Sequence, residues 1–156
     1  MKSPNKTPEF KLERIIPALP GEVFDAWLDP KIPGNPWNAA EKFILDPKVD
    51  GLFFWTLNRT SHYGRFTEFE RPSRMQHTWM SPKTLGEESM VTLTFVKQGE
   101  DTLMTLVHSD LPDHELARGH ERGWKCFLDI FPEQFGNGSR KEYRWEDVHP
   151  EEVKKN

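Results

Sequence analysis

Residues 115–135, ELARGHERGWKCFLDIFPEQF, carry the longest helical pattern of the chain. At about 100° per residue, the apolar side chains and one histidine lie within about a third of the helix circumference. These positions are Leu116, Ala117, His120, Trp124, Phe127, Leu128, Phe131 and Phe135. The stretch predicts a long amphipathic C-terminal helix that kinks or restarts at Pro132 and ends at residues 136–138, Gly-Asn-Gly.

Ahead of this helix, between Glu41 and Val107, the apolar period changes to two, which is typical of strands with one buried face. Strands are expected near residues 43–45, 53–57, 63–69, 75–79, 91–95 and 104–108, after an earlier one over residues 10–16 that Pro17 stops. Short turns join most of them, which predicts an antiparallel meander. The absence of strand–helix–strand alternation argues against a parallel, doubly wound sheet.

Two short helices are expected between the first strand and the meander. Pro20 opens the first, whose apolar stripe includes Phe24 and Trp27, and Pro30 closes it. Residues 31–38 contain two prolines and a glycine, so this segment is either a short second helix or an irregular crossover.

Length and charge narrow the class of protein. A chain of 156 residues favours one domain, which we place at residues 9–136, followed by a charged C-terminal extension at residues 137–156. The net charge of −4, with acids and bases interspersed, argues against a nucleic-acid surface. No stretch approaches the ~18 apolar residues of a membrane span, and no secretory signal precedes the domain. We therefore expect a cytoplasmic protein with no nucleic-acid or membrane partner.

Six blocks of sequence in a fixed order carry a resemblance to a known family. They are LPGEVFDAWLDP (19–30), VDGLFFWTL (49–57), YGRFTEFERPSRMQHTWM (63–80), VTLTFV (91–96), TLMTLVHSDL (102–111) and GHERGWKCFLDIF (119–131). In this order the blocks resemble the START-like (SRPBCC) superfamily. Within it, they resemble the family related to the C-terminal domain of activators of heat-shock-protein-90 ATPase.

The resemblance implies an α+β helix-grip (START/Bet v-like) fold. Its curved antiparallel sheet of six to seven strands wraps around the long C-terminal helix, with two short helices after the first strand and a cavity between sheet and helix. It implies no common reaction. The namesake activators carry an additional N-terminal domain that is not found in this chain, and His77 stands where the family pattern has an aromatic or aliphatic residue.

Strand parity places several large rings and histidines on the concave side of such a sheet. Helical phase then turns His120 and Trp124 toward them. Glu68 is expected to share a face with Gly64 and Phe66, unless it lies on a solvated strand face. The candidate cavity residues are Trp55, Phe66, Glu68, His77, Trp79, Phe95, His108, His120, Trp124 and Phe127. They form either a packed core with at most a narrow cavity or the apolar wall of a ligand pocket.

Three functions remain open for this interior. The first is binding of a small hydrophobic or aromatic molecule. The second is a cyclase- or hydrolase-type enzyme that uses His77, His108 or Glu68, which the same superfamily contains. The third is a chaperone- or partner-binding module, and a homodimer is compatible with all three. We expect no cofactor and no metal, because the histidines lack the close spacing of a metal site. No nucleophile motif, such as a GxSxG elbow, occurs.

Overall fold

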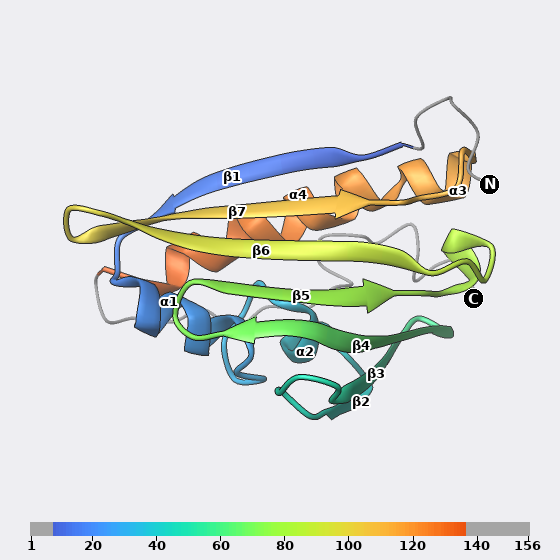
Figure 1. Cartoon of the computed structure of the whole chain (residues 1–156), viewed down its shortest axis with the longest axis horizontal. Helices are drawn as coiled ribbons and strands as arrows, with labels where there is room; N and C mark the ends of the chain where they lie inside the picture. The colour runs from blue at the N-terminus through green and yellow to red at the C-terminus, as the bar shows by residue number, and fades with distance from the viewer. Residues whose placement is uncertain (1–7, 137–156) are drawn as a thin grey trace.

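Seven strands form one sheet in the computed structural model, which describes residues 8–136 (Figure 1). The strands are β1 (Phe10–Ile16), β2 (Lys42–Leu45), β3 (Leu52–Leu57), β4 (Thr60–Glu70), β5 (Arg74–Trp79), β6 (Ser89–Gln98) and β7 (Asp101–Ser109). Their spatial order is β1-β7-β6-β5-β4-β3-β2, and every neighbouring pair is antiparallel. The predicted meander is confirmed, and β1 extends it by pairing with β7.

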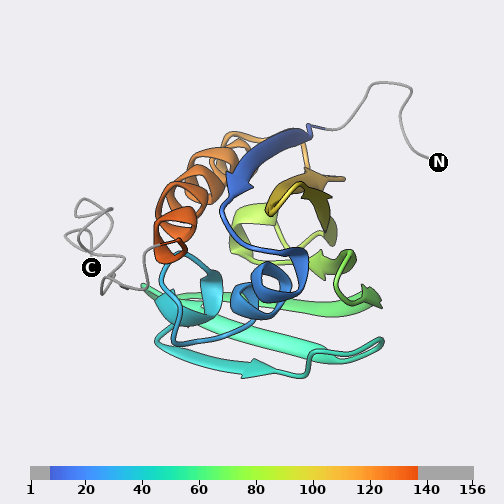
Figure 2. The ribbon, with the colours of Figure 1, turned by 90° about the vertical axis from the view of Figure 1, so that its left-hand side faces the viewer.

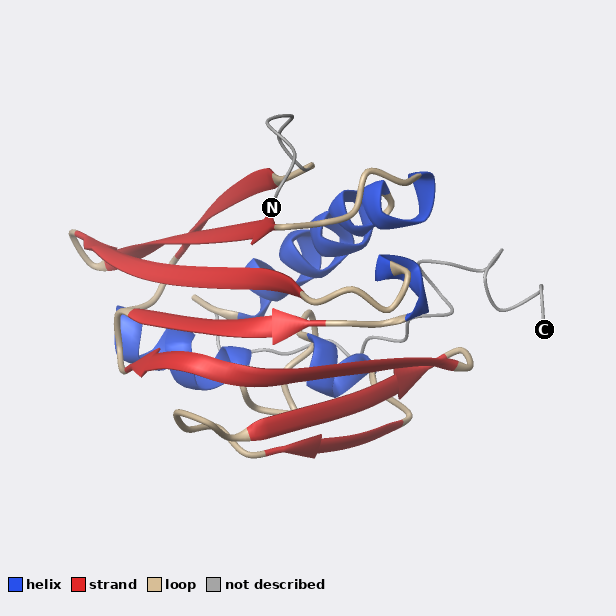
Figure 3. Cartoon of the chain, turned by 45° about the vertical axis from the view of Figure 1, so that its right-hand side comes forward, coloured by secondary structure: helices blue, strands red, loops and turns tan. Residues whose placement is uncertain are grey.

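The sheet curls around helix α4 (His120–Ile130), which Figure 2 shows in a view along the strands. Helices α1 (Pro20–Trp27), α2 (Pro36–Ala39) and α4 all lie on the same side of the sheet (Figure 3). Burial alternates along the strands as the period of two requires. In β7, for example, Thr102, Met104, Leu106 and His108 are buried and the residues between them are half-buried. The helix-grip fold expected from the sequence is confirmed.

The two short helices after β1 close one end of the concave face. Helix α1 (Pro20–Trp27) starts at its proline and buries Phe24 and Trp27. The shorter α2 (Pro36–Ala39) is capped by Asn35, whose side chain accepts a hydrogen bond from the Asn38 amide. Asn35 is fully buried, and its Nδ2 also donates to the Ala26 and Asp29 carbonyls at 2.8 and 2.9 Å. This one amide side chain ties α2 to the end of α1.

The C-terminal helix differs from the prediction in one respect. Instead of one helix from residue 115, a short α3 (Glu115–Arg118) precedes α4, and a 3-10 turn, η2 (Phe131–Gln134), follows it. Gly119 separates α3 from α4, and Pro132 lies in the 3-10 turn. The buried stripe of α4 continues into α3 at Ala117, which is fully buried as predicted, but not at Leu116. Leu116, predicted on the buried stripe, is 49% exposed.

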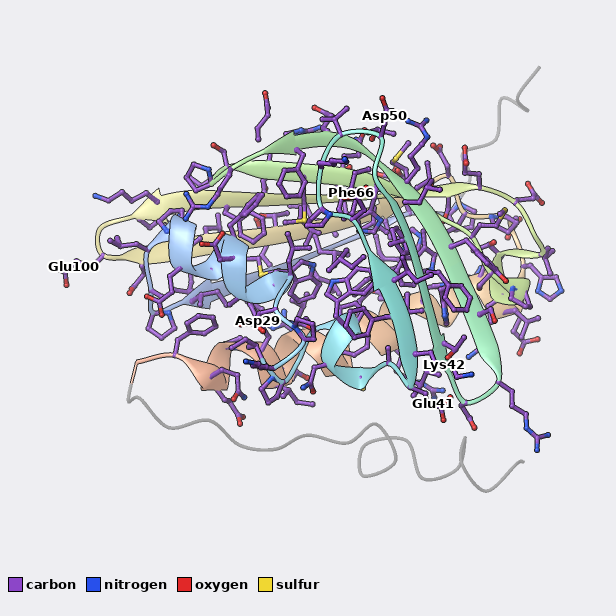
Figure 4. The ribbon with its side chains drawn as sticks, turned by 90° about the horizontal axis from the view of Figure 1, so that it is seen from below. Asp29, Glu41, Lys42, Asp50, Phe66 and Glu100 are labelled. Atoms are coloured by element: carbon purple, nitrogen blue, oxygen red, sulfur yellow. The ribbon has the colours of Figure 1, made fainter. Side chains whose placement is uncertain are left out.

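The interior lies between the concave face of the sheet and the helices. Phe66 of β4 points into it, whereas Asp50 and Glu100 lie at the periphery (Figure 4). In the described part of the chain, no helix is long and apolar enough to span a membrane. The predicted charged extension, residues 137–156, lies outside the described residues.

Candidate functional site

The indole of Trp79, near the end of β5, is the centre of a cluster of buried rings that we call the concave cluster. The rings around it have centroids 5.1–6.4 Å from that of Trp79. They belong to Phe53 and Trp55 of β3, His62 of β4, His77 of β5, His108 of β7, and His120 and Trp124 of α4. Rings from β3, β4, β5 and β7 therefore meet those of α4 on the concave face of the sheet.

His108 is held from both sides of its ring. The Trp124 Nε1–H group donates to Nδ1 at 3.0 Å, because an indole nitrogen can only donate. In a neutral imidazole the proton is then on Nε2, which donates to the Ser89 hydroxyl at 2.8 Å. The hydroxyl donates in turn to the Trp79 carbonyl at 2.7 Å. All three side chains are buried.

This direction of the hydrogen bonds defines what Ser89 can do. A serine nucleophile needs a base that accepts its proton, whereas here the imidazole donates to the hydroxyl and the hydroxyl donates to a main-chain carbonyl. Burial, together with the nearby His120 and His77, also holds the pKa of His108 well below its ordinary value. A neutral imidazole is what this chain of hydrogen bonds requires. The Ser89–His108 pair is a structural link between β6, β7 and α4.

His77 is likewise satisfied by the protein. Its Nδ1–H group donates to the Thr78 carbonyl at 2.9 Å, and its ring packs edge-on against Phe53 and Phe66 at 4.9 and 5.4 Å. Burial lowers the pKa of His77 to about 4, so the ring is neutral at pH 7. The imidazole takes the place of a core aromatic residue.

The sequence analysis missed His62. Its ring stacks on Trp55 at 4.1 Å with an interplanar angle of 12°, and the two residues are register partners on β4 and β3. Burial is the main cause that lowers the pKa of His62 to about 3, with His120 and Lys83 adding to it. The signal was present in the sequence, because His62 has the same strand parity as Gly64 and Phe66.

His120 sits at the first position of α4, half-buried. Its Nδ1–H group donates to the Ala117 carbonyl at 2.8 Å. Its ring centroid is 5.0 Å from that of His108. Burial is again the main cause that lowers its pKa, and Lys83 adds to the effect. The neutral ring with its proton on Nδ1 leaves Nε2 as a hydrogen-bond acceptor.

Four polar atoms of the concave cluster are buried without a hydrogen-bond partner in the described part of the chain. They are Trp55 Nε1, Trp79 Nε1, His62 Nδ1 and His120 Nε2. Their rings are neighbours, since the centroid of Trp79 lies 5.7, 5.1 and 6.4 Å from those of Trp55, His62 and His120. Buried polar groups in folded proteins are nearly always paired. Four of the six such atoms in the described part of the chain lie at the Trp55–His62–Trp79–His120 end, which we call the polar end of the cluster; the other two, Trp37 Nε1 and Asn38 Oδ1, are on α2.

Of the two placements considered for Glu68, the solvated strand face is confirmed and the inner face shared with Phe66 is wrong. A bulge between the two residues shifts the register, so that Phe66 pairs with His77 and Glu68 with Gln76. Glu68 forms an ion pair with Arg74 at 3.1 Å, with both side chains more than a third exposed. Of the three residues considered for catalysis, Glu68 is thus removed from the interior.

The remaining candidates occupy different parts of the core. Phe66 packs against His77, and Phe127 against Trp124 at 5.8 Å, so both belong to the surroundings of the concave cluster. Phe95 packs against Phe24 of α1 at 5.3 Å, toward the other end of the interior. Within residues 8–136, no three His, Cys, Asp or Glu side chains are grouped so that they could hold a metal ion.

An apolar strip is exposed on the convex face at the β2 edge of the sheet. Register brings together Ile44, Phe54 and Tyr63 on adjacent strands, and Ile44 is 64% exposed. Leu52 lies beside them and is 62% exposed. The partner-binding and homodimer hypotheses both concern such a surface, and both stay predictions.

Comparisons with known proteins agree with the fold. A sequence model described as "Activator of Hsp90 ATPase homolog 1-like protein" matches residues 17–136. Among curated protein sequences, none matches the chain. The crystal structure of an HSP90 activator from Plasmodium falciparum is similar, with 21% identity, a TM-score of 0.65, and coverage of 78% of this chain and 91% of that one.

Two further structures are similar at the same level. CalU16 from Micromonospora echinospora has 23% identity and a TM-score of 0.61, over 80% of this chain and 75% of that one. DynU16, from the dynemicin biosynthetic locus, has 19% identity and a TM-score of 0.69, over 86% of this chain and 49% of that one. At these identities the likeness establishes the fold alone.

Proposed function

Because the chain belongs to the family of Activator of Hsp90 ATPase homolog 1-like proteins, whose fold it shares, we propose that it binds a small hydrophobic or aromatic molecule. The proposed site lies between the concave face of the sheet and helix α4, at the concave cluster. The family and the fold do not specify a ligand, so the support comes from the site itself.

The observation that carries this proposal is the group of four unpaired polar atoms among buried rings. Each buried donor or acceptor without a partner costs about 1–3 kcal/mol. A small molecule with a polar group offsets several of these costs at once, and the surrounding rings offer it an apolar wall. A core selected for stability alone has no reason to gather such atoms at one end.

Thermal unfolding and Trp fluorescence test the proposal with a panel of small hydrophobic probes that includes tetralin and 1-tetralone. A probe at about ten times its Kd adds about 1.4 kcal/mol, which raises the Tm of a domain of this size by roughly 3–5 °C. Binding next to Trp55 and Trp79 also changes their emission. No Tm shift and no fluorescence change with any probe of the panel would contradict the proposal.

The Trp55→Ala variant locates the site. Trp55 contributes a ring to the polar end, so its truncation is expected to weaken probe binding at least fivefold. Trp27→Phe is the control, because Trp27 is equally buried but packs on Trp124 and Phe131, outside the polar end. Equal loss of affinity in both variants would indicate a general weakening of the core instead of a local site.

A further inference from the structure

The polar end of the concave cluster has a fixed hydrogen-bonding character. The Nε1 atoms of Trp55 and Trp79 can only donate, and both are unpaired. The Nδ1–H group of His120 donates to the Ala117 carbonyl, so the unpaired Nε2 of the neutral ring is a hydrogen-bond acceptor. The polar end therefore presents two N–H donors, one imidazole acceptor and the Nδ1 atom of His62, whose role depends on its tautomer. The donors of Trp124 and His77, in contrast, are already bonded to His108 and to the Thr78 carbonyl.

A positive charge lies beside the same end. The 3-10 turn η1 (Pro82–Thr84) packs against β4, which carries His62, and against α3, which immediately precedes His120 of α4. Its conformation is fixed by Ser81, whose hydroxyl accepts from the Lys83 amide at 3.0 Å, and by Thr84, whose hydroxyl donates to the Ser81 carbonyl. Lys83 is near enough to lower the pKa of both His62 and His120. Its charge favours an electron-rich atom there.

We infer that the ligand of this site is an oxygenated aromatic molecule, with a carbonyl or hydroxyl oxygen that accepts hydrogen bonds from Trp55 Nε1 and Trp79 Nε1. The inference rests on the proposed function and specifies its ligand class. A carbonyl oxygen has two lone pairs and suits two indole donors. A hydroxyl adds a proton for His120 Nε2. A pure hydrocarbon leaves all of these atoms unpaired.

Isothermal titration with three probes of one carbon skeleton tests the inference. Tetralin carries no oxygen, 1-tetralone carries an acceptor, and 5,6,7,8-tetrahydro-2-naphthol carries a hydroxyl. One net hydrogen bond is worth about 0.5–1.5 kcal/mol, or roughly a twofold to tenfold change in Kd. We expect both oxygenated probes to bind the wild-type chain at least threefold more tightly than tetralin.

Indole-to-phenyl variants assign the preference to the two donors. Trp79→Phe, and independently Trp55→Phe, should weaken 1-tetralone binding at least threefold while leaving tetralin within twofold. Two variants are needed because Trp79 is the centre of the cluster and its replacement also disturbs packing. Trp27→Phe makes the same ring change away from the polar end, and should leave the ratio of the two affinities unchanged.

The outcomes separate this inference from the proposed function. If tetralin binds as tightly as the oxygenated probes, the site binds hydrophobic molecules and the oxygen preference is wrong. If both Trp→Phe variants keep the wild-type ratio, the indole donors are satisfied by ordered water only, and the inference is again overturned. If none of the three probes binds, the proposed function and the inference fall together. The assignment is supported only if the ratio of the tetralin Kd to the 1-tetralone Kd falls in Trp55→Phe or Trp79→Phe.

Discussion

Replacing His77 with Phe should make the protein less sensitive to acid. The folded chain holds the pKa of His77 at about 4 because the ring is buried, against 6.5 for an ordinary histidine. A pKa lowered in the folded state favours the neutral ring, so its contribution to stability is complete above pH 6.5 and is lost as the pH falls toward 4. At about 1.4 kcal/mol per pKa unit, the full loss is about 3 kcal/mol, and about 2 kcal/mol of it is lost by pH 5.

The variant suits the site because His77 already packs as an aromatic residue, edge-on to Phe53 at 4.9 Å and to Phe66 at 5.4 Å. A phenyl ring fits the same contacts and gives up only the hydrogen bond to the Thr78 carbonyl, worth about 1 kcal/mol. His77→Phe is therefore expected to be about as stable as the wild type, or slightly less so, at pH 7.5.

Urea unfolding at pH 7.5, 6 and 5 measures the effect through the free energy of unfolding. The wild type should lose about 2 kcal/mol more than His77→Phe between pH 7.5 and 5. The replacement also removes one of the causes that lower the pKa of His108, and this secondary effect acts in the same direction as the loss of His77 itself. Parallel pH profiles for the two proteins would refute the reasoning, because they would mean that His77 binds protons equally in the folded and unfolded chain.

Three further substitutions probe other parts of the structure. Trp124→Phe removes the donor to His108 Nδ1 and leaves a buried acceptor unpaired, so the free energy of unfolding in urea should fall by about 2 kcal/mol; a loss below about 0.5 kcal/mol would contradict the bond. Glu68→Gln breaks only a half-exposed ion pair with Arg74 and should cost less than about 1 kcal/mol, with 1-tetralone affinity unchanged in calorimetry. Gly64→Ala places a methyl group where the Phe53 ring and the Thr78 carbonyl oxygen lie, so Tm should fall by an amount that corresponds to about 3 kcal/mol; a wild-type Tm would show that β3 and β4 are further apart.

Much of the interior could be predicted because it depends on periodicity. Trp55, His77 and His108 follow from a period of two along regular strands, and Trp124 from the phase of a regular helix. The predictions failed where regularity ends. The bulge after Phe66 turns Glu68 outward, and no residue in that stretch marks it, since neither Thr67 nor Glu68 is a glycine or proline. Leu116 failed for a different reason, because it lies at the edge of the predicted stripe, whereas Ala117 beside it is buried as predicted.

Hydrogen-bond partners were beyond sequence reasoning for a different reason. Ser89 and His108 lie 19 residues apart, and their contact depends on the register of β6 against β7 and on two side-chain rotamers. A shift of the register by one residue would place one of them on the opposite face of the sheet. Periodicity indicates which face a residue occupies, but not which atom its neighbour presents to it.

The four histidines of the concave cluster lie together but differ in the atoms that their neighbours present to them. All four have a lowered pKa with burial as the main cause, so the direction of the pKa shift does not distinguish them. The His77 Nδ1–H group, however, donates to the Thr78 carbonyl, both nitrogens of His108 are bonded, to Ser89 on the sheet and to Trp124 on α4, and neither ring has a fully buried unpaired nitrogen. His62 and His120 each keep one, next to two unpaired indole N–H groups. Hydrogen bonds to a ligand offset a cost only at atoms that the folded chain leaves unpaired, so the proposed site lies at His62 and His120 rather than at His77 and His108.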